Sequence, residues 1–211
     1  QVLIVEVGTR DGIQAEKQFV ELDQKLRMLE LIVAAGVRRI EATSFVSPRH
    51  VPQMADAAEV LAGMERPPGM EIEALVPNMR GMERALECQL DRVVLFVAAS
   101  EGFNLKNLRA GREKMLDAAR EAAKEAHGAG MKIRGGVVTA FGCPYEGRVP
   151  LEAVERIAGD YADMGCDEVG LADTVGMTNP VAVRRMAEHI RAKFPEIRFT
   201  LHFHNTRGVG L

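Results

Sequence analysis

Two histidines separated by a single phenylalanine, His202 and His204, lie in the stretch LHFHNTRGVGL at positions 201–211. On an extended strand successive side chains point to opposite faces, so both imidazoles are expected on one face. Leu201 and Phe203 are then expected on the other face. Two imidazoles on one face can bind a metal ion, although such a pair is more often packed or hydrogen-bonded without one.

A carboxylate near the beginning of the chain could complete a ligand set. Asp11 stands in GTRDGIQ, where an Asp-Gly pair is also typical of a turn. One carboxylate and the imidazoles of His202 and His204 would leave positions open for substrate and water. Such a mixed oxygen and nitrogen set suits Mn²⁺, Mg²⁺, Fe²⁺ or Zn²⁺. We therefore predict a metal site formed by Asp11, His202 and His204.

Arg10 and Glu41 are expected to form an ion pair beside that metal site. A guanidinium there can also stabilise the negative charge that develops on a carbonyl oxygen, as an enolate-forming reaction requires. The two roles are compatible, because Glu41 would hold Arg10 in place.

Three further polar residues have two interpretations each. Asp173, in ADTVGMTNP, is a turn or cap residue before a helix that starts near Pro180, or it orients or exchanges a proton with a metal-bound hydroxyl. Asn78 either bonds a substrate or forms a turn. Cys143, in FGCPYEG, is interpreted as a small buried residue and not as a nucleophile, since no base lies beside it in the sequence.

Seven β-rich runs alternate with helical stretches, which predicts a parallel sheet. The runs are VLIVEV (2–7), RRIEATS (38–44), EIEALVP (71–77), RVVLFVAAS (92–100), KIRGGVVTAF (132–141), DEVGLADT (167–174) and RFTLHFHN (198–205). One intervening helix, over 112–127, carries a clear apolar stripe. Glycines at positions 36, 130 and 165 suit the left-handed ends of helices.

The first run leads into GTRDGIQ and not into a G-x-G-x-x-G phosphate loop, which favours a closed barrel over an open sheet. We predict an α/β TIM (β/α)₈ barrel with about seven βα units, forming one catalytic domain over 1–211. The domain is expected to be trimmed at the front and to continue past Leu211. In such a barrel, polar residues at the strand ends converge on one face: Arg10, Asp11, Glu41, Ser44, Asn78, Asp173, Thr174, His202 and His204. Charged residues at the opposite strand ends are interpreted as a solvent-facing rim: Arg38, Glu71, Arg92, Lys132 and Asp167.

The composition of the chain limits the classes of partner that it is expected to bind. The net charge of -3 and the absence of tryptophan and of a basic stripe argue against a nucleic-acid or membrane partner and for a small polar substrate. No apolar run is long enough for a membrane span. Three widely spaced cysteines indicate a reducing compartment, of which the cytoplasm is the simplest.

Several separated stretches, in order, resemble the 3-hydroxy-3-methylglutaryl-CoA lyase family. They are EVGTRDGIQAEK, IEATSFVSPRHVPQM, LFVAASEGFNLKNL, GCPYEGRVP, VGLADTVGMTNP and LHFHNTRG. Ile13 after Arg-Asp-Gly resembles the lyases, since related synthases usually carry Glu there. Thr9 and Phe203 stand at positions where better-known lyases of the family often have Pro and Cys, respectively.

The resemblance implies retro-Claisen cleavage of an acyl-CoA to acetyl-CoA and acetoacetate, as in leucine degradation and ketone-body formation. It implies Mg²⁺ or Mn²⁺, with Zn²⁺ as a further option, held by Asp11, His202 and His204. Arg10 would stabilise the enolate and His202 would transfer a proton, with Glu41 and Asp173 in support. Expected substrate contacts are Arg10, Gln14, Ser44, Asn78 and Thr174. A fourth metal ligand, an asparagine, and a cysteine in a mobile loop are expected beyond Leu211. Arg49 is a candidate for coenzyme A binding. A homodimer or higher homo-oligomer is expected.

Three alternatives stay open. The first is a lyase acting on another acyl-CoA, such as citramalyl-CoA, which would release pyruvate. The second is a synthase or aldolase of the same barrel group. The third is a non-catalytic metal-binding relative, which the joint presence of Arg10, Asp11, Glu41 and both histidines disfavours.

Overall fold

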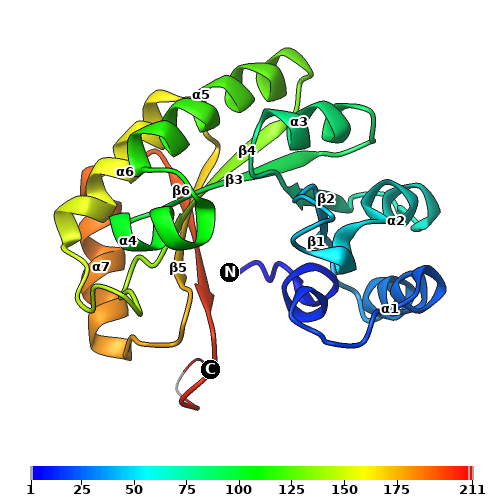
Figure 1. Ribbon diagram of the computed structural model, residues 1–211, viewed down its shortest axis with the longest axis horizontal. Coiled ribbons are helices and arrows are strands. Elements are labelled where there is room, and N and C mark those ends of the chain that lie inside the picture. Colours follow the sequence, from blue (N-terminus) through cyan, green and yellow to red (C-terminus); the bar gives the residue numbers. More distant parts are fainter. Residues whose placement is uncertain (1, 209, 211) are drawn as a thin grey trace. The chain divides into compact units, whose positions relative to one another are not determined.

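Six parallel strands alternate with helices along the chain (Figure 1). The structure is a computed structural model that describes residues 2–208 and 210, so Gln1, Val209 and Leu211 of the predicted domain lie outside the described residues. Neighbouring strands follow chain order, β1-β2-β3-β4-β5-β6. The strands are β1 (Arg39–Ser44), β2 (Glu71–Leu75), β3 (Arg92–Ala98), β4 (Lys132–Val138), β5 (Glu168–Asp173) and β6 (Arg198–Phe203).

The connections between strands are mostly α-helical, as the predicted βα repeat requires. The α-helices are α1 (Leu22–Ala34), α2 (Ala57–Gly63), α3 (Met79–Leu86), α4 (Glu101–Phe103), α5 (Arg112–Gly128), α6 (Leu151–Asp163) and α7 (Pro180–Lys193). Shorter helical segments are η1 (Gly8–Gly12), η2 (Pro52–Met54) and η3 (Asn104–Leu108). None of the described helices is both long and apolar enough to cross a bilayer.

The chain divides into two compact units. The first comprises Gln1–Val94 and Glu125–Lys132, and the second comprises Leu95–Lys124 and Ile133–Leu211. Strand β3 changes unit after Val94 and so contributes residues to both.

In the first unit, β1 pairs with β2 and β2 pairs with the beginning of β3, all in parallel. All six residues of β1 are buried, which is typical of a parallel strand with both faces covered. Ile40 lies opposite Ile72, and Ala74 lies opposite Val93. The core of this unit also takes Leu29 from α1, Leu61 from α2 and Met82 from α3.

In the second unit, β4 pairs with β5 and β5 with β6, again in parallel. Helices α6 and α7 contact one another and lie together in this unit (Figure 1). Tyr161 of α6 is completely buried and donates a hydrogen bond from its hydroxyl to the Gly136 carbonyl, at 3.1 Å. A Cβ at Gly135 would come within 2.3 Å of the Tyr161 ring. A residue without a side chain is therefore required where α6 packs on β4.

The predicted helix over 112–127 is confirmed as α5. Its alanine stripe faces the core, since Ala119, Ala122, Ala123 and Ala126 are all buried. The predicted left-handed glycines are also confirmed, with φ of 90° at Gly36, 72° at Gly130 and 73° at Gly165.

The prediction of a strand over 2–7 is wrong, and the described chain has six strands, not seven. Glu6 alone forms a parallel bridge, with Ile40 of β1. Val2 is 90% exposed and Ile4 is 71% exposed, so these apolar side chains gain no burial that would favour extended pairing.

The predicted solvent-facing rim is wrong for Arg92, which is 2% exposed. Arg39 and Glu73 are buried beside it, and the Arg39 guanidinium donates to Glu73 at 2.7 and 3.0 Å. The Arg92 Nε atom lies 3.6 Å from the same Glu73 carboxylate. Charged side chains can be buried here because they are paired, which periodicity does not reveal. Arg38, Lys132 and Asp167 are exposed, as predicted, and Glu71 is half-buried.

Candidate functional site

Segment η1 carries Arg10 and Asp11 and is tied to β1 of the first unit. The Glu6 N–H donates to the Arg39 carbonyl at 3.0 Å, and the Glu41 N–H donates to the Glu6 carbonyl at 2.8 Å. These two bonds place the turn that follows Glu6 beside the carboxyl half of β1. Glu41, in β1, is therefore within reach of Arg10.

Arg10 binds two carboxylates. Its Nε donates to Glu41 Oε1, and its Nη1 donates to Asp11 Oδ1 at 2.6 Å. The side chains of Arg10, Asp11 and Glu41 are 11%, 19% and 2% exposed. The predicted Arg10–Glu41 pair is thus confirmed. A guanidinium held between two carboxylates has a fixed orientation, which suits it to binding an oxyanion.

The two histidines lie at the end of β6 in the second unit. Their ring centroids are 4.9 Å apart and the rings are tilted by 61°, so the predicted placement on one face is confirmed. His202 lies opposite Ala172 of β5, and the His204 N–H donates to the Asp173 carbonyl at 3.5 Å. The register of β5 and β6 therefore brings the histidines beside the end of β5.

Asp173 forms the turn after β5. The carboxylate is 3% exposed, and its two oxygens accept the Met177 N–H at 2.8 Å and the Thr178 N–H at 3.2 Å. The predicted turn role is confirmed. The helix cap belongs to Asn179, whose side chain accepts the Ala182 N–H at 3.0 Å, while α7 begins at Pro180 as predicted.

The loop after β5 packs against the end of β6 through Gly176. Its φ is +66°, and a Cβ there would lie 2.7 Å from the His204 carbonyl oxygen. Arg207 donates from Nε to the Gly176 carbonyl at 2.8 Å and from Nη2 to the Thr178 carbonyl at 2.6 Å. Gly176 and Arg207 thus support the histidines and the Asp173 turn. Sequence reasoning missed both, because neither carries an isolated chemical signature.

The four predicted substrate contacts other than Arg10 lie in two different units. In the first unit, Ser44 is fully buried and its hydroxyl donates to the Leu75 carbonyl at 3.3 Å. Asn78 caps α3 by accepting the Gly81 N–H at 3.0 Å, and Gln14 is half-buried. In the second unit, the Thr174 hydroxyl oxygen accepts the Thr139 N–H at 2.7 Å.

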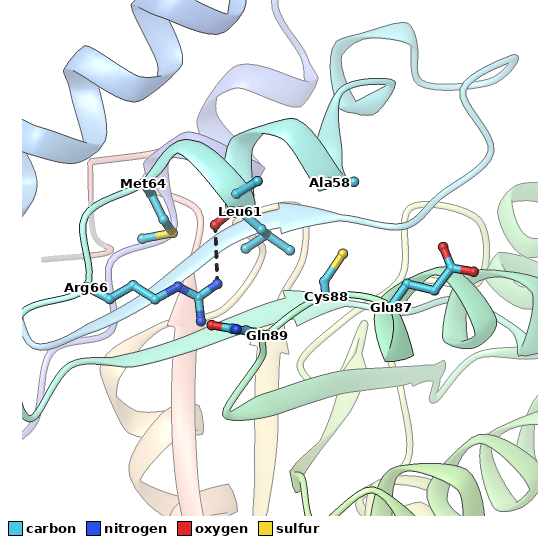
Figure 2. Close-up of a pocket in the computed structure, with 8 residues that line it drawn as sticks. Ala58, Leu61, Met64, Arg66, Glu87, Cys88 and Gln89 are labelled. Atoms are coloured by element: carbon cyan, nitrogen blue, oxygen red, sulfur yellow. Dashed lines mark hydrogen bonds between the residues drawn. The ribbon is translucent and has the colours of Figure 1, made fainter.

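A pocket of about 570 Å³ lies between α2 and α3 of the first unit (Figure 2). It contains no predicted site residue. Arg66 donates to the Leu61 carbonyl at 3.3 Å, and Cys88 lines the same pocket. Burial raises the pKa of the Cys88 thiol, so this is not an activated thiolate. The pocket lacks the paired acid and base groups that the predicted chemistry needs.

A second pocket, of about 400 Å³, lies against β6 and α7 in the second unit. Leu201 and Phe203 line it together with apolar residues of α7, and Asp173 and His204 border it. It brings two of the predicted residues to a hollow surface, unlike the pocket between α2 and α3.

The chain matches known proteins over its whole length. The model of the HMGL-like family matches residues 1–211. The chain is 41% identical over 211 residues to the 3-hydroxy-3-isohexenylglutaryl-CoA/hydroxy-methylglutaryl-CoA lyase of Pseudomonas aeruginosa, covering 100% of this chain and 70% of that protein. It spans 65% to 71% of the length of the curated lyases that it matches.

Solved structures agree with the sequence comparisons. The crystal structure of hydroxymethylglutaryl-CoA lyase from Pseudomonas aeruginosa has a TM-score of 0.95 and 41% identity, covering 99% of this chain and 70% of that one. An HMG-CoA lyase from Acinetobacter baumannii in complex with coenzyme A and 3-methylmalate has a TM-score of 0.93 and 37% identity, covering 98% and 67%. The predicted TIM-barrel fold is confirmed by these likenesses, and the described chain carries six of its parallel strands.

Proposed function

The chain belongs to the HMGL-like family of metal-dependent lyases, and from this premise we propose that it cleaves 3-hydroxy-3-methylglutaryl-CoA to acetyl-CoA and acetoacetate. The observation that carries the proposal is 41% identity across all 211 residues to a lyase of that name. We further propose that residues 1–211 act as one catalytic domain.

A divalent cation is proposed to bind Asp11, His202 and His204. Each side chain offers one ligand atom, a carboxylate oxygen or a ring nitrogen. This donor set fits Mg²⁺ or Mn²⁺, and also Zn²⁺, and the 4.9 Å between the imidazole rings is compatible with ligation from one face. When bound, the ion would hold the substrate hydroxyl and distal carboxylate and lower the energy of the negative charge that develops on the hydroxyl oxygen.

Arg10 is proposed to bind the thioester oxygen. Cleavage of the carbon–carbon bond leaves its electron pair on the acetyl-CoA fragment as an enolate, whose oxygen becomes negative. The Arg10 guanidinium, fixed by Glu41, would stabilise that charge without reorganising during the reaction.

His202 is proposed to exchange the proton. Loss of the substrate hydroxyl proton turns that oxygen into the ketone of acetoacetate, and a proton returned to the enolate carbon completes acetyl-CoA. Asp173 would keep the loop beside the histidines in place, because both of its oxygens accept backbone N–H groups. Gln14, Ser44, Asn78 and Thr174 are proposed to line the acyl site.

Acyl-CoA is the proposed partner class, supported by the coenzyme A in the Acinetobacter relative, and Arg49 stays a candidate contact. A homodimer or higher homo-oligomer remains our expectation. The cytoplasm is the proposed compartment, since Cys88, Cys143 and Cys166 are all free.

A second candidate substrate is 3-hydroxy-3-isohexenylglutaryl-CoA, because the name of the Pseudomonas relative includes it. It differs from the first by a long apolar branch in place of a methyl group, so the same residues would act on it.

A product assay tests the proposal. The purified protein, with Mn²⁺ or Mg²⁺ added, is supplied in turn with 3-hydroxy-3-methylglutaryl-CoA, its isohexenyl analogue and citramalyl-CoA, and the keto acid is identified by mass spectrometry. We expect acetoacetate and acetyl-CoA from the first thioester, and loss of turnover after chelation. Pyruvate from citramalyl-CoA alone, or full activity after exhaustive chelation, would contradict the proposal.

A further inference from the structure

Thr139, directly after β4, has an uncommon backbone. Its φ is +54°, and its side chain is completely buried. A β-branched residue in the left-handed region is an outlier, because its side chain crowds the backbone there. Such conformations persist only where the surroundings hold them, and they cluster at functional sites.

Contacts from three segments of the second unit hold Thr139. Its Oγ1 lies 3.3 Å from the Ser100 hydroxyl and accepts the Ser100 N–H at 3.4 Å. The Thr139 carbonyl accepts the Gly142 N–H at 3.3 Å, which closes a turn. The next residue, Ala140, donates its N–H to the Ala172 carbonyl at 3.0 Å. The ends of β3, β4 and β5 are thereby tied together around Thr139.

The left-handed backbone directs the Thr139 N–H at a predicted substrate contact. This N–H donates to the Thr174 hydroxyl oxygen at 2.7 Å. An oxygen that accepts in this way keeps its own hydrogen for donation. Among the described residues the Thr174 hydroxyl has no acceptor, and the residue is half-buried beside Asp173.

We propose that Thr139 is a positioning residue, whose left-handed backbone orients the Thr174 hydroxyl to donate a hydrogen bond to an oxygen of the acyl substrate. This inference rests on the proposed function, since it names the donor that the acyl group meets. Thr139 itself does not touch substrate, because its side chain is completely buried. Thr139 acts on the Thr174 hydroxyl through its N–H, and the contact with Ser100 holds the Thr139 backbone in its conformation.

Two substitutions at Thr139 separate a backbone role from a side-chain role. Thr139→Val keeps the size and branching but loses the contact with Ser100, so the left-handed conformation loses its anchor. Thr139→Gly removes the whole side chain, yet glycine adopts this conformation without steric cost. Thr139→Ser keeps the hydroxyl and serves as the rescue variant.

Steady-state kinetics of the metal-loaded protein with its thioester substrate give the test. We expect Thr174→Val to lower kcat/KM about tenfold, the loss of one substrate hydrogen bond. Thr139→Val is expected to lower kcat/KM by nearly the same factor, while the kcat/KM values of Thr139→Ser and Thr139→Gly stay closer to that of the parent. The double variant Thr139→Val/Thr174→Val should be no worse than Thr174→Val alone, because both changes remove one interaction.

The control is Thr43→Val, which changes a buried threonine in β1. Within the part of the chain that the structure describes, its hydroxyl donates only to the sulfur of Met54, at 3.7 Å. Its kcat/KM should be unchanged. If Thr139→Val does not fold, Ser100→Ala removes the same anchor from the other side and is expected to match Thr174→Val.

Additive losses in the double variant, or a Thr139→Gly variant as impaired as Thr139→Val, would overturn this inference while the parent still cleaves the thioester. A parent protein that cleaves none of the three thioesters would overturn the proposed function and this inference with it. The two failures are therefore distinguishable in one assay.

Discussion

Arg10 makes its two ion pairs with carboxylates of different burial, Glu41 at 2% and Asp11 at 19% exposure. The buried partner fixes the guanidinium, whereas the more exposed partner is the proposed metal ligand. One arginine thus links the residue that orients it to the residue that would bind the ion. Substitutions at Arg10 and at Asp11 therefore test oxyanion binding and metal binding one at a time.

We predict that Arg10→Gln spares metal binding and lowers cleavage by about 10²- to 10³-fold, the effect of losing one oxyanion donor. Asp11→Asn should weaken metal binding and cleavage together, because an amide is a poorer ligand for a hard cation. Metal affinity by calorimetry and turnover by the thioester assay measure the two effects. Arg10→Lys is the control that keeps the charge, and normal turnover by the Arg10→Gln protein would refute this mechanism.

Individual site residues could be predicted from the sequence where the spacing of residues along the chain determines where their side chains lie. The alternation of a strand predicts the side-by-side imidazoles of His202 and His204, and opposite charges at strand ends predict the pair of Arg10 and Glu41. Sequence reasoning could not find Thr139, because a β-branched residue argues against a left-handed backbone. Only the contacts with Ser100 and with the neighbouring strands explain that conformation.

At the level of elements, the loop after β5 depends on one glycine. Gly176 combines a φ of +66° with a close approach to the His204 carbonyl. A side chain at that position would push the Asp173 turn away from β6. The loop and the histidines therefore form one packed element.

We predict that Gly176→Ala lowers the free energy of unfolding by about 1–3 kcal/mol, since alanine adds both left-handed strain and a steric clash. Turnover should fall with it, as His204 moves. Gly128→Ala, at the end of α5, is the matched control, because the added Cβ would meet no atom within 4 Å apart from its chain neighbours and the helix's own backbone. That control should be neutral or stabilising by up to about 1 kcal/mol in urea unfolding. Equal stabilities of the two variants would contradict the account.

Six of the seven predicted strands begin within one residue of the observed ones, because each of these β-rich runs is bounded by turn or helix-end residues. The run VLIVEV is also rich in β-branched residues and still forms only a bridge. Propensity describes what a segment can adopt, whereas burial decides what it does adopt. The burial of Arg39, Glu73 and Arg92 was not predicted, because periodicity does not reveal that Glu73 pairs with Arg39, 34 residues before it, and with Arg92, 19 residues after it.

For the molecule as a whole, charge pairs at the amino ends of the strands make stability depend on pH. A hydrogen bond from Lys132, opposed in part by desolvation, lowers the pKa of Glu71 below 4.5. A carboxylate with a lowered folded-state pKa stabilises the protein above the unfolded pKa, and this contribution is lost as the pH falls through the folded pKa.

We predict that the free energy of unfolding decreases as the pH falls below about 4.5, and that Glu71→Gln makes this decrease shallower. Urea unfolding at about pH 5.5 and about pH 3.5 measures it. Glu65→Gln changes an exposed glutamate that has no ion pair among the described residues, and it should leave the slope as it is. If the free energy of unfolding of the Glu71→Gln protein fell with pH as steeply as that of the parent, other carboxylates would be responsible for the loss of stability in acid.

The agreement between spatial order and chain order has a kinetic consequence. In both units every strand pairs with the strand next to it in the sequence, so each pairing closes a loop of similar, modest length. A nascent polypeptide can therefore add one strand–helix repeat at a time as it leaves the ribosome. Each strand from β2 to β6 can therefore pair first with the strand made just before it, which shortens the time that an unpaired edge is exposed to aggregation.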